Sequence, residues 1–148
     1  MNWDVLSFFV EHSRKFNTNK DLRLALVTNL TLLNEKKMKF LCDNDVEICS
    51  SLDGPRFIHD KNRCFKDGKG TYTTVTNKIK KLNKQFNKRV NLLPTITKES
   101  LKFHKEIIDE YVKLGLLKKK NFLKCPVQED IVLEINEKTN FPIKTFCD

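Results

Sequence analysis

The N-terminal third of the chain carries apolar residues at spacings that predict two helices. Apolar side chains crowd positions 3 to 10, so the first helix is expected to be well buried. A second helix is expected from Thr18 onward, because leucines recur there at helical intervals, at Leu22, Leu26, Leu30 and Leu33. Two such helices would pack as a helical hairpin. Residues 39–50 are ambiguous and could form two short strands around a turn.

The middle of the chain predicts a basic amphipathic helix. Asp53-Gly54-Pro55 breaks the preceding pattern, and residues 64–73 could form a small hairpin around the turn at 67–70. Beyond this point the apolar positions align on one helical face, at Val75, Ile79, Leu82, Phe86 and Val90. Lysines and an arginine occupy most of the remaining positions of this helix.

The last third predicts one more helix followed by strands. Pro94 ends the basic run, Thr97 is a suitable N-cap, and Gly115 is placed to end the helix at the C′ position. Strand-like sequence follows at 116–120 and 131–135. The expected fold is therefore α+β and mainly α, in a single domain over 1–148 with a possible subdivision into 1–55 and 56–148.

The order of elements from Thr97 to Asn136 resembles the end of a winged-helix domain. A helix ends in Leu114-Gly115-Leu116-Leu117, and a basic strand, a polar turn and a β-rich strand follow. The resemblance implies a fold often used on DNA, with the last helix in the major groove. The helix in question is nearly neutral, however, because acidic residues balance its lysines at Glu99, Glu106, Asp109 and Glu110. This departure argues against sequence-specific DNA reading by that helix.

The net positive charge of the chain lies in one segment. Residues 56–91 hold eleven Lys/Arg and two Asp/Glu, a net of +9, whereas 1–55 and 92–148 carry nets of −1 and +1. Such a segment predicts salt-sensitive contact with a nucleic-acid backbone, without base reading. The predicted phosphate contacts are Arg63, Lys66, Lys69, Lys78, Lys81, Lys84, Lys88 and Arg89. The sequence thus favours a non-catalytic nucleic-acid-binding accessory protein, acting on DNA or RNA, with a protein partner at its neutral ends.

Three alternatives to this interpretation remain open at the level of the sequence. The protein could be an adaptor subunit of a larger assembly whose lysines are only solvated. The basic helix could instead lie on an anionic membrane surface. The lysine excess could also reflect an AT-rich coding genome, since Asn is abundant as well.

The sequence offers little for catalysis or metal binding. Cys42, Cys49, His59 and Cys64 lack the closely paired spacing of structural zinc sites, so no metal is expected. Cys64 near His59 could form a thiol–imidazole pair, but closeness in sequence says little about geometry. Residues 67–71 are typical of a turn instead of a phosphate loop. No catalytic residue, cofactor or small-molecule substrate is therefore predicted. The odd number of cysteines, with no signal peptide or membrane span, predicts an intracellular protein of the cytoplasm or nucleus.

Overall fold

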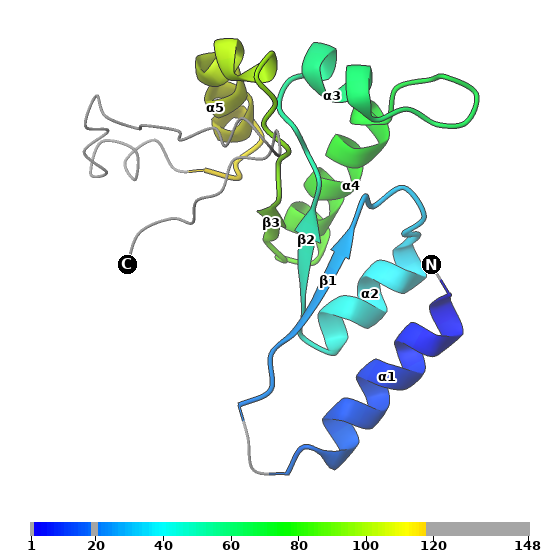
Figure 1. Cartoon of the computed structure of the whole chain (residues 1–148). Helices are drawn as coiled ribbons and strands as arrows, with labels where there is room; N and C mark the ends of the chain where they lie inside the picture. Colours follow the sequence, from blue (N-terminus) through cyan, green and yellow to red (C-terminus); the bar gives the residue numbers. More distant parts are fainter. Residues whose placement is uncertain (1, 19–20, 118–148) are drawn as a thin grey trace, which may run out of the picture. The chain divides into compact units, whose positions relative to one another are not determined.

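The computed structural model describes residues 2–18 and 21–117, in which helices alternate with strands (Figure 1). In chain order the elements are α1 (Trp3–Phe16), β1 (Leu24–Thr28), α2 (Glu35–Asp43), β2 (Val46–Ser50), α3 (Arg56–Asn62), α4 (Tyr72–Gln85), β3 (Val90–Leu92), the 3₁₀ segment η1 (Ser100–Phe103) and α5 (His104–Lys113). The predicted α+β class is confirmed. The arrangement is a repeat in which each strand is followed by a helix.

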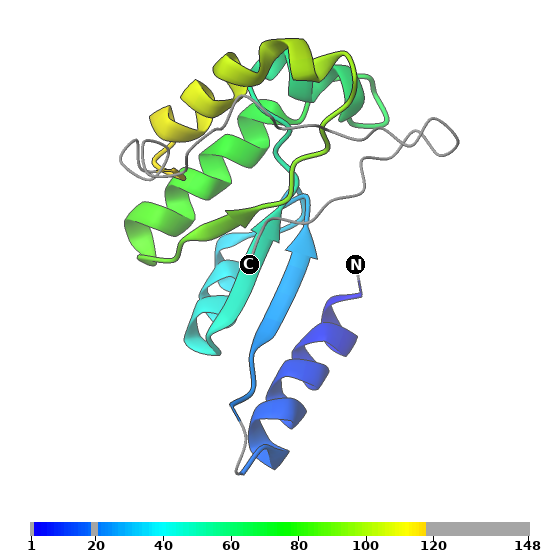
Figure 2. The same ribbon diagram turned by 60° about the vertical axis from the view of Figure 1, so that its left-hand side comes forward.

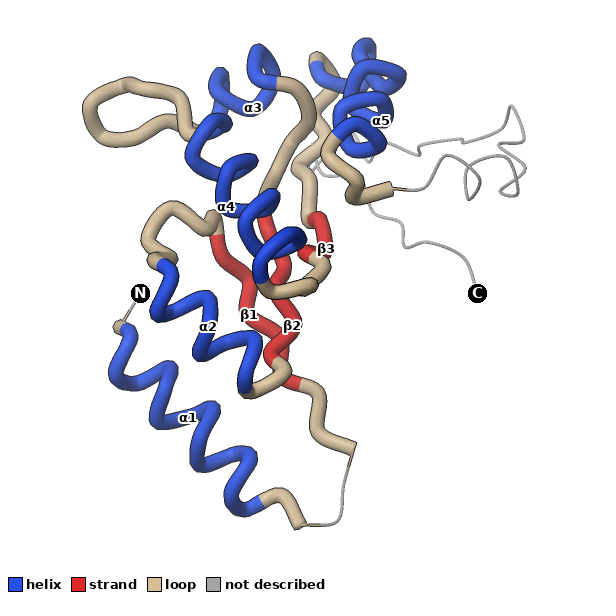
Figure 3. Tube along the Cα trace, turned by 180° about the vertical axis from the view of Figure 1, so that it is seen from behind, coloured by secondary structure: helices blue, strands red, loops and turns tan. Residues whose placement is uncertain are grey.

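The three strands form a single parallel sheet in the order β1-β2-β3. Parallel neighbours need crossover connections, and here helices supply them. Crossovers of one hand that always step in the same direction leave their helices on the same face of the sheet. Figure 3 shows α2 and α4 lying over one side of the strands. The sequential order therefore separates a covered face from an open one.

The covered face of the sheet carries the core. Val46, Ile48 and Val90 point to this face and are at most 2% exposed. Helix α4 turns Val75, Ile79 and Leu82 toward them, all with no exposed surface. Complete burial of one such side chain contributes about 1.5–3 kcal/mol. This apolar contact explains why the amphipathic pattern of α4 forms a helix against the sheet.

In the described part of the chain, the opposite face of the sheet is largely exposed. Val27, Cys49 and Asn91 stand side by side on it in the parallel register. The Val27 side chain is 63% exposed, and Ala25 and Glu47 on the same face are exposed as well. All-parallel sheets are almost always covered on both faces. Within the described residues, this face of the sheet therefore lacks the covering layer that parallel sheets usually have.

The predicted second helix is wrong, because residues 24–28 form strand β1. Over so short an apolar run, helical spacing and strand alternation cannot be separated from the sequence. The run ends at Leu30, whose φ of +62° is incompatible with a continuing helix. Asn34 then starts α2 by accepting a hydrogen bond from the Lys37 N–H, at 2.9 Å. Instead of two packed helices, the N-terminal third contains α1, β1 and α2.

Among the other expected elements, the structure agrees with the two helices and changes the short strands and the hairpin. The ambiguous stretch 39–50 is the end of α2 followed by β2, and the predicted basic helix is α4, which stops at Gln85 so that Val90 belongs to β3. The expected hairpin at 64–73 is reduced to a single antiparallel bridge between Cys64 and Gly70. The C-terminal helix is found as η1 and α5, with Gly115 at φ +72° after its end.

The winged-helix resemblance has no support. The helix that would enter DNA packs beside a parallel sheet, because βα crossovers, and not a helix-turn-helix, build its surroundings. The two strands expected at 116–120 and 131–135 fall almost wholly outside the described residues.

Candidate ligand site at the carboxyl edge of the sheet

The carboxyl ends of the three parallel strands meet at one edge of the sheet, where Ser50 ends β2. The side chain of Ser50 is fully buried, and within 2–18 and 21–117 its Oγ atom has no hydrogen-bond partner. A buried hydroxyl without a partner costs free energy, so it normally has a structural or ligand-binding reason. In open α/β sheets, ligands bind outside the carboxyl ends of the strands. Ser50 therefore marks this edge as the candidate site.

The loop that follows Ser50 is fixed by an ion pair whose carboxylate is buried. Asp53, 1% exposed, accepts hydrogen bonds from Arg63 Nε at 2.6 Å and Arg63 Nη2 at 3.2 Å. Its Oδ1 also accepts the backbone N–H of Thr95, at 2.8 Å. Thr95 follows β3, so one carboxylate joins the segments after two neighbouring strands. A bidentate, charge-assisted contact of this kind holds both segments in a defined geometry.

His59 and Thr71 complete a closed loop of hydrogen bonds with Asp53 and Arg63. Its Nδ1 accepts the backbone N–H of Asp53 at 3.3 Å, so the ring proton lies on Nε2, which donates to Thr71 Oγ1 at 3.0 Å. The Thr71 hydroxyl donates in turn to the backbone carbonyl of Arg63, at 2.9 Å. Burial of His59 lowers the pKa of its imidazole, although Asp53 opposes this shift. We call these four residues the Asp53–His59–Thr71–Arg63 ring.

Helix α5 supports the same loop from the other side. The phenol of Tyr111 donates to the backbone carbonyl of Leu52 at 2.6 Å, and burial raises the pKa of this phenol. Gly54 has a φ of +125°, and a Cβ atom there would lie 2.8 Å from Cγ1 of Ile107. Only glycine combines this backbone conformation with so close a helix.

The start of α4 is held by a residue of α3. Thr71, the N-cap of α4, makes no side-chain cap; instead Asp60 Oδ1 accepts the Tyr72 N–H at 2.8 Å. A negative charge at a helix N-terminus is favourable. A side chain at Gly70 would collide with the Asp60 carboxylate. The Tyr72 phenol donates to the nearly buried carboxylate of Glu110; burial, followed by this hydrogen bond, raises the pKa of the phenol.

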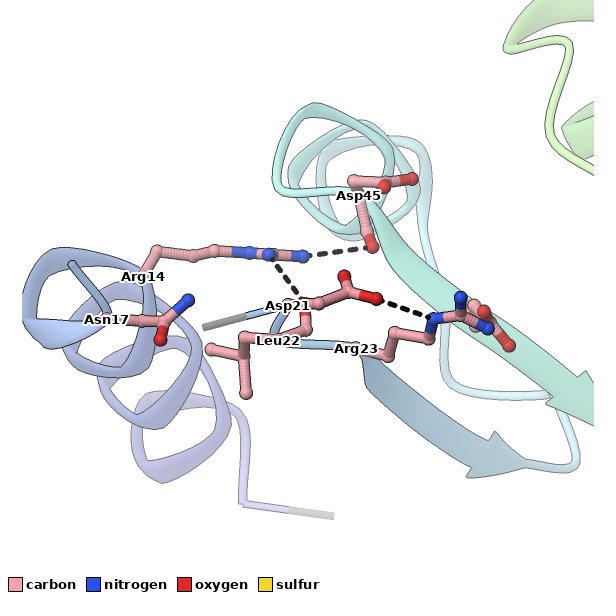
Figure 4. Close-up of a pocket in the computed structure, with 7 residues that line it drawn as sticks. Arg14, Asn17, Asp21, Leu22, Arg23 and Asp45 are labelled. Carbon is pink, nitrogen blue, oxygen red and sulfur yellow. Dashed lines mark hydrogen bonds and ion pairs between the residues drawn. The ribbon is translucent and has the colours of Figure 1, made fainter. Parts of the chain in front are cut away.

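A hollow lies at the opposite, amino edge of the sheet (Figure 4). Its volume is about 330 Å³, and its lining is mostly polar. Arg14 in its wall donates to the backbone carbonyls of Leu22, Asn44 and Asp45, which ties α1 to the segment before β1 and to the turn between α2 and β2. Asp21 and Arg23 form an exposed pair there at 3.5 Å. Because these groups bind one another, the hollow is a structural junction.

The predicted phosphate contacts lie on α4 and in the segments before and after it. Most of these cations have partners within the molecule: Arg63 binds Asp53, Lys69 binds Asp67, Lys81 binds Glu35 and Lys88 binds Asp45. Two more hold the backbone, since Lys78 donates to the carbonyls of Leu30 and Thr31 and Arg89 donates to that of Leu116. Lys66 and Lys84 are exposed. Six of the eight predicted contact residues thus make an ion pair or a hydrogen bond within the described residues.

The cysteines and histidines of the described ranges form no candidate metal site. In the described ranges no group of three or more His, Cys, Asp or Glu side chains could hold a metal ion. Cys42, Cys49 and Cys64 are free thiols, and burial raises the pKa of Cys42. Among the helices of the described residues, none has the length and apolar character needed to cross a membrane.

Sequence reasoning missed Ser50, Asp53 and His59 as a group. The available signal was a cluster of polar residues directly after the strand-like run Val46–Cys49. That cluster gained meaning only once the run was known to be a strand of a parallel sheet, whose carboxyl end is the usual place for a ligand.

Comparison with known proteins places the chain beside a class of enzymes. No family model matches it. The chain is 32% identical over 144 residues to the cysteine-type anaerobic sulfatase-maturating enzyme of Clostridium perfringens, covering 94% of the chain and 37% of that protein. It is 30% identical over 123 residues to the enzyme of the same name from Clostridium novyi, covering 82% of the chain and 32% of that protein. The chain thus spans about a third of the length of the curated relatives it matches.

Solved structures agree with these sequence relatives. Native anSMEcpe with bound AdoMet and the Kp18Cys peptide has a TM-score of 0.70 and 27% identity, over 78% of this chain and 32% of that one. The same protein with bound AdoMet alone gives the same TM-score and identity. The fold is therefore similar to that of the anaerobic sulfatase-maturating enzymes.

These findings overturn the functional predictions made from the sequence. The prediction of a non-catalytic nucleic-acid-binding accessory protein is wrong, because the named relatives are enzymes and a structural neighbour binds AdoMet and a peptide. The predictions of no enzyme, of a DNA-binding winged helix in a complex, and of a nucleic-acid partner without a small-molecule substrate are wrong for the same reason. Those predictions rested on charge composition, and three of the predicted contact residues, Arg63, Lys81 and Lys88, form ion pairs within the described residues.

Proposed function

We propose that this chain forms the AdoMet-binding part of an enzyme of the anaerobic sulfatase-maturating kind. The observation that carries the proposal is 32% identity over 94% of the chain to such an enzyme, together with the TM-score of 0.70 to a structure holding AdoMet. The complete enzyme would act on a cysteine-containing peptide of a sulfatase. An intracellular location goes with this proposal, and the nuclear alternative loses support because the enzyme relatives are clostridial.

The carboxyl edge has groups that suit this cofactor. AdoMet carries a carboxylate, an ammonium and ribose hydroxyls, all of which need hydrogen-bond partners when enclosed by protein. Ser50 Oγ is buried and unpartnered within the described residues, so it can donate to or accept from such a group without losing an existing bond. When bound, AdoMet supplies a carbon activated by a positively charged sulfur.

The protein's own residues would position the cofactor. The Asp53–His59–Thr71–Arg63 ring fixes the loop directly after Ser50, and Asp53 fixes the segment after β3 through Thr95. Binding groups held in this way lose little conformational freedom when a ligand arrives. The open face, with Val27, Cys49 and Asn91 in one row, would form the adjoining wall.

A titration with AdoMet tests the proposal. Because the chain spans a third of its relatives, weak binding is expected, and NMR of the ¹⁵N-labelled 148-residue chain detects it. Amide shifts should move at Ser50, Ser51 and Leu93, and Ser50→Ala should lower the affinity roughly five- to tenfold, as expected for one hydrogen bond. Ser7→Ala, on the distant helix α1, serves as the matched control. Saturating AdoMet without shifts at the carboxyl edge would refute the proposal.

A further inference from the structure

The loop between β1 and α2 leaves the sheet at the same edge as the candidate site. Thr28, the last residue of β1, is the register partner of Ser50, so the loop begins directly beside the unpartnered hydroxyl. Figures 1 and 2 show the loop leaving the sheet at the end where β2 also ends. A ligand that contacts Ser50 therefore lies next to the first residues of this loop.

The same loop contains a strained residue. Leu30 has a φ of +62°, a left-handed conformation that is unfavourable for a residue with a side chain. Its side chain is fully buried in the core, and its backbone N–H donates to the hydroxyl of Thr28 at 3.1 Å. Strain of this kind persists only where surrounding contacts hold it, and strained residues cluster at functional sites. The turn at Leu30 therefore needs a contact that maintains it.

Lys78 of α4 supplies that contact. Its Nζ atom donates to the backbone carbonyl of Leu30 at 3.0 Å and to that of Thr31 at 2.7 Å, although these residues lie 48 and 47 positions away in the sequence. Burial, and after it the neighbouring charge of Lys37, lowers the pKa of the Lys78 ammonium. The ammonium has thus exchanged water for the two carbonyls. Lys81 of the same helix instead binds an exposed carboxylate.

We propose that Lys78 is a positioning residue for AdoMet, which holds the strained turn at Leu30 and so fixes the loop that borders the cofactor beside Ser50. This inference rests on the proposed function for the identity of the ligand. Both hydrogen bonds of Lys78 go to the loop, so the lysine acts through the backbone and not on the cofactor itself. Without it the turn would relax toward negative φ, and the path of the backbone directly after Thr28 would change. A binding-competent conformation that only a fraction of the molecules adopt lowers the apparent affinity by that fraction.

Substitutions at Lys78 test this role in two measurements on the ¹⁵N-labelled chain. Lys78→Met removes the ammonium and keeps the apolar stem. It should speed amide hydrogen exchange at Leu30 and Leu33 by roughly tenfold or more, because a charge-assisted hydrogen bond no longer holds the turn. It should also weaken AdoMet binding by roughly tenfold, read from the amide shifts of Ser50 and Ser51. Lys78→Arg, which can donate to both carbonyls, should keep both quantities within about twofold of the unsubstituted chain, and Lys78→Gln should fall between the two.

The matched control is Lys80→Met, because Lys80 is an exposed lysine of the same helix, and it should change neither quantity. Faster exchange in Lys78→Met with unchanged AdoMet affinity would overturn the positioning role and leave a purely structural lysine. Unchanged exchange, or a loss of affinity that Lys78→Arg shares in full, would overturn the hold on the loop. If AdoMet moves no amide shift at the carboxyl edge of the unsubstituted chain, the proposed function fails and AdoMet is not the ligand. Hydrogen exchange then still decides whether Lys78 holds the turn, so the two failures are separate results.

Discussion

Arg63 binds the buried carboxylate of Asp53 at two points, with Nε to Oδ2 at 2.6 Å and Nη2 to Oδ1 at 3.2 Å. The two residues lie on either side of α3, and the pair also reaches the segment after β3 through Thr95. The sequence suggested a phosphate contact for Arg63. In the structure this arginine is instead the residue that fixes the loop beside Ser50.

Loss of the Asp53 carboxylate should destabilise the protein markedly. Asp53→Asn removes the charge from a group that is 1% exposed and weakens three hydrogen bonds, so the free energy of unfolding should fall by about 2–4 kcal/mol. Asp67→Asn breaks the exposed pair with Lys69 and should change it by less than about 0.5 kcal/mol. Urea unfolding measures both. Equal effects of the two substitutions would contradict the role given to the buried pair.

Stability should depend on pH through His59. Its pKa is lowered in the folded state by burial, so the unfolded chain binds the proton more readily. The contribution of neutral His59 is complete above the unfolded pKa of about 6.5 and decreases as the pH falls below it. His59→Gln should lower stability at pH 7.5 and flatten the decline between pH 7 and 5. The exposed His104, changed to Gln, should leave that decline intact; thermal unfolding across this range decides.

Two glycines with positive φ should respond differently to alanine. Gly54→Ala combines an unfavourable backbone with a Cβ placed 2.8 Å from Ile107 and should cost about 3 kcal/mol or more. Gly68 has a φ of +82°, and nothing lies within 4 Å of the place a Cβ would take, so Gly68→Ala should cost only about 1 kcal/mol. Adding Ile107→Ala to Gly54→Ala tests the contact. A double-mutant cycle with no coupling would show that backbone strain alone explains Gly54.

Asp60 should stabilise α4 from outside the helix. It accepts the Tyr72 N–H at 2.8 Å and places a negative charge at the helix N-terminus. Asp60→Asn should keep part of the hydrogen bond and lose the charge, for a cost of about 0.5–1 kcal/mol, and Asp60→Ala should cost about 1–2 kcal/mol. Asp109→Asn, on the exposed side of α5, is the control. Chemical denaturation that ranks the Asn and Ala variants equally would argue against a contribution from charge.

The helices show how much of the fold could be predicted from the sequence. The apolar positions Val75, Ile79 and Leu82 predict α4, and all three are fully buried against the sheet. Gly115 marks the end of α5 and has the left-handed φ that a C′ glycine supplies. These elements were predictable because their signals lie within a few residues of each other along the chain. The stretch from Leu22 to Leu33 has helical spacing, and only the long-range pairing of Leu24–Thr28 with β2 makes part of it a strand.

The candidate site depended on contacts that no local pattern contains. Thr95 lies 42 positions beyond Asp53, and Tyr111 lies 59 beyond Leu52, yet both bind the loop after β2. The ion pairs of the lysines could not be predicted either. Lys88, for example, binds Asp45, which lies 43 positions away in the sequence. By itself the sequence determined α4 and α5 through their period or end residues, and α1 through its run of apolar positions. The tertiary structure alone decided the parallel sheet, its carboxyl edge and the use of the cations, because long-range packing chooses the partners of strands, charges and buried polar groups.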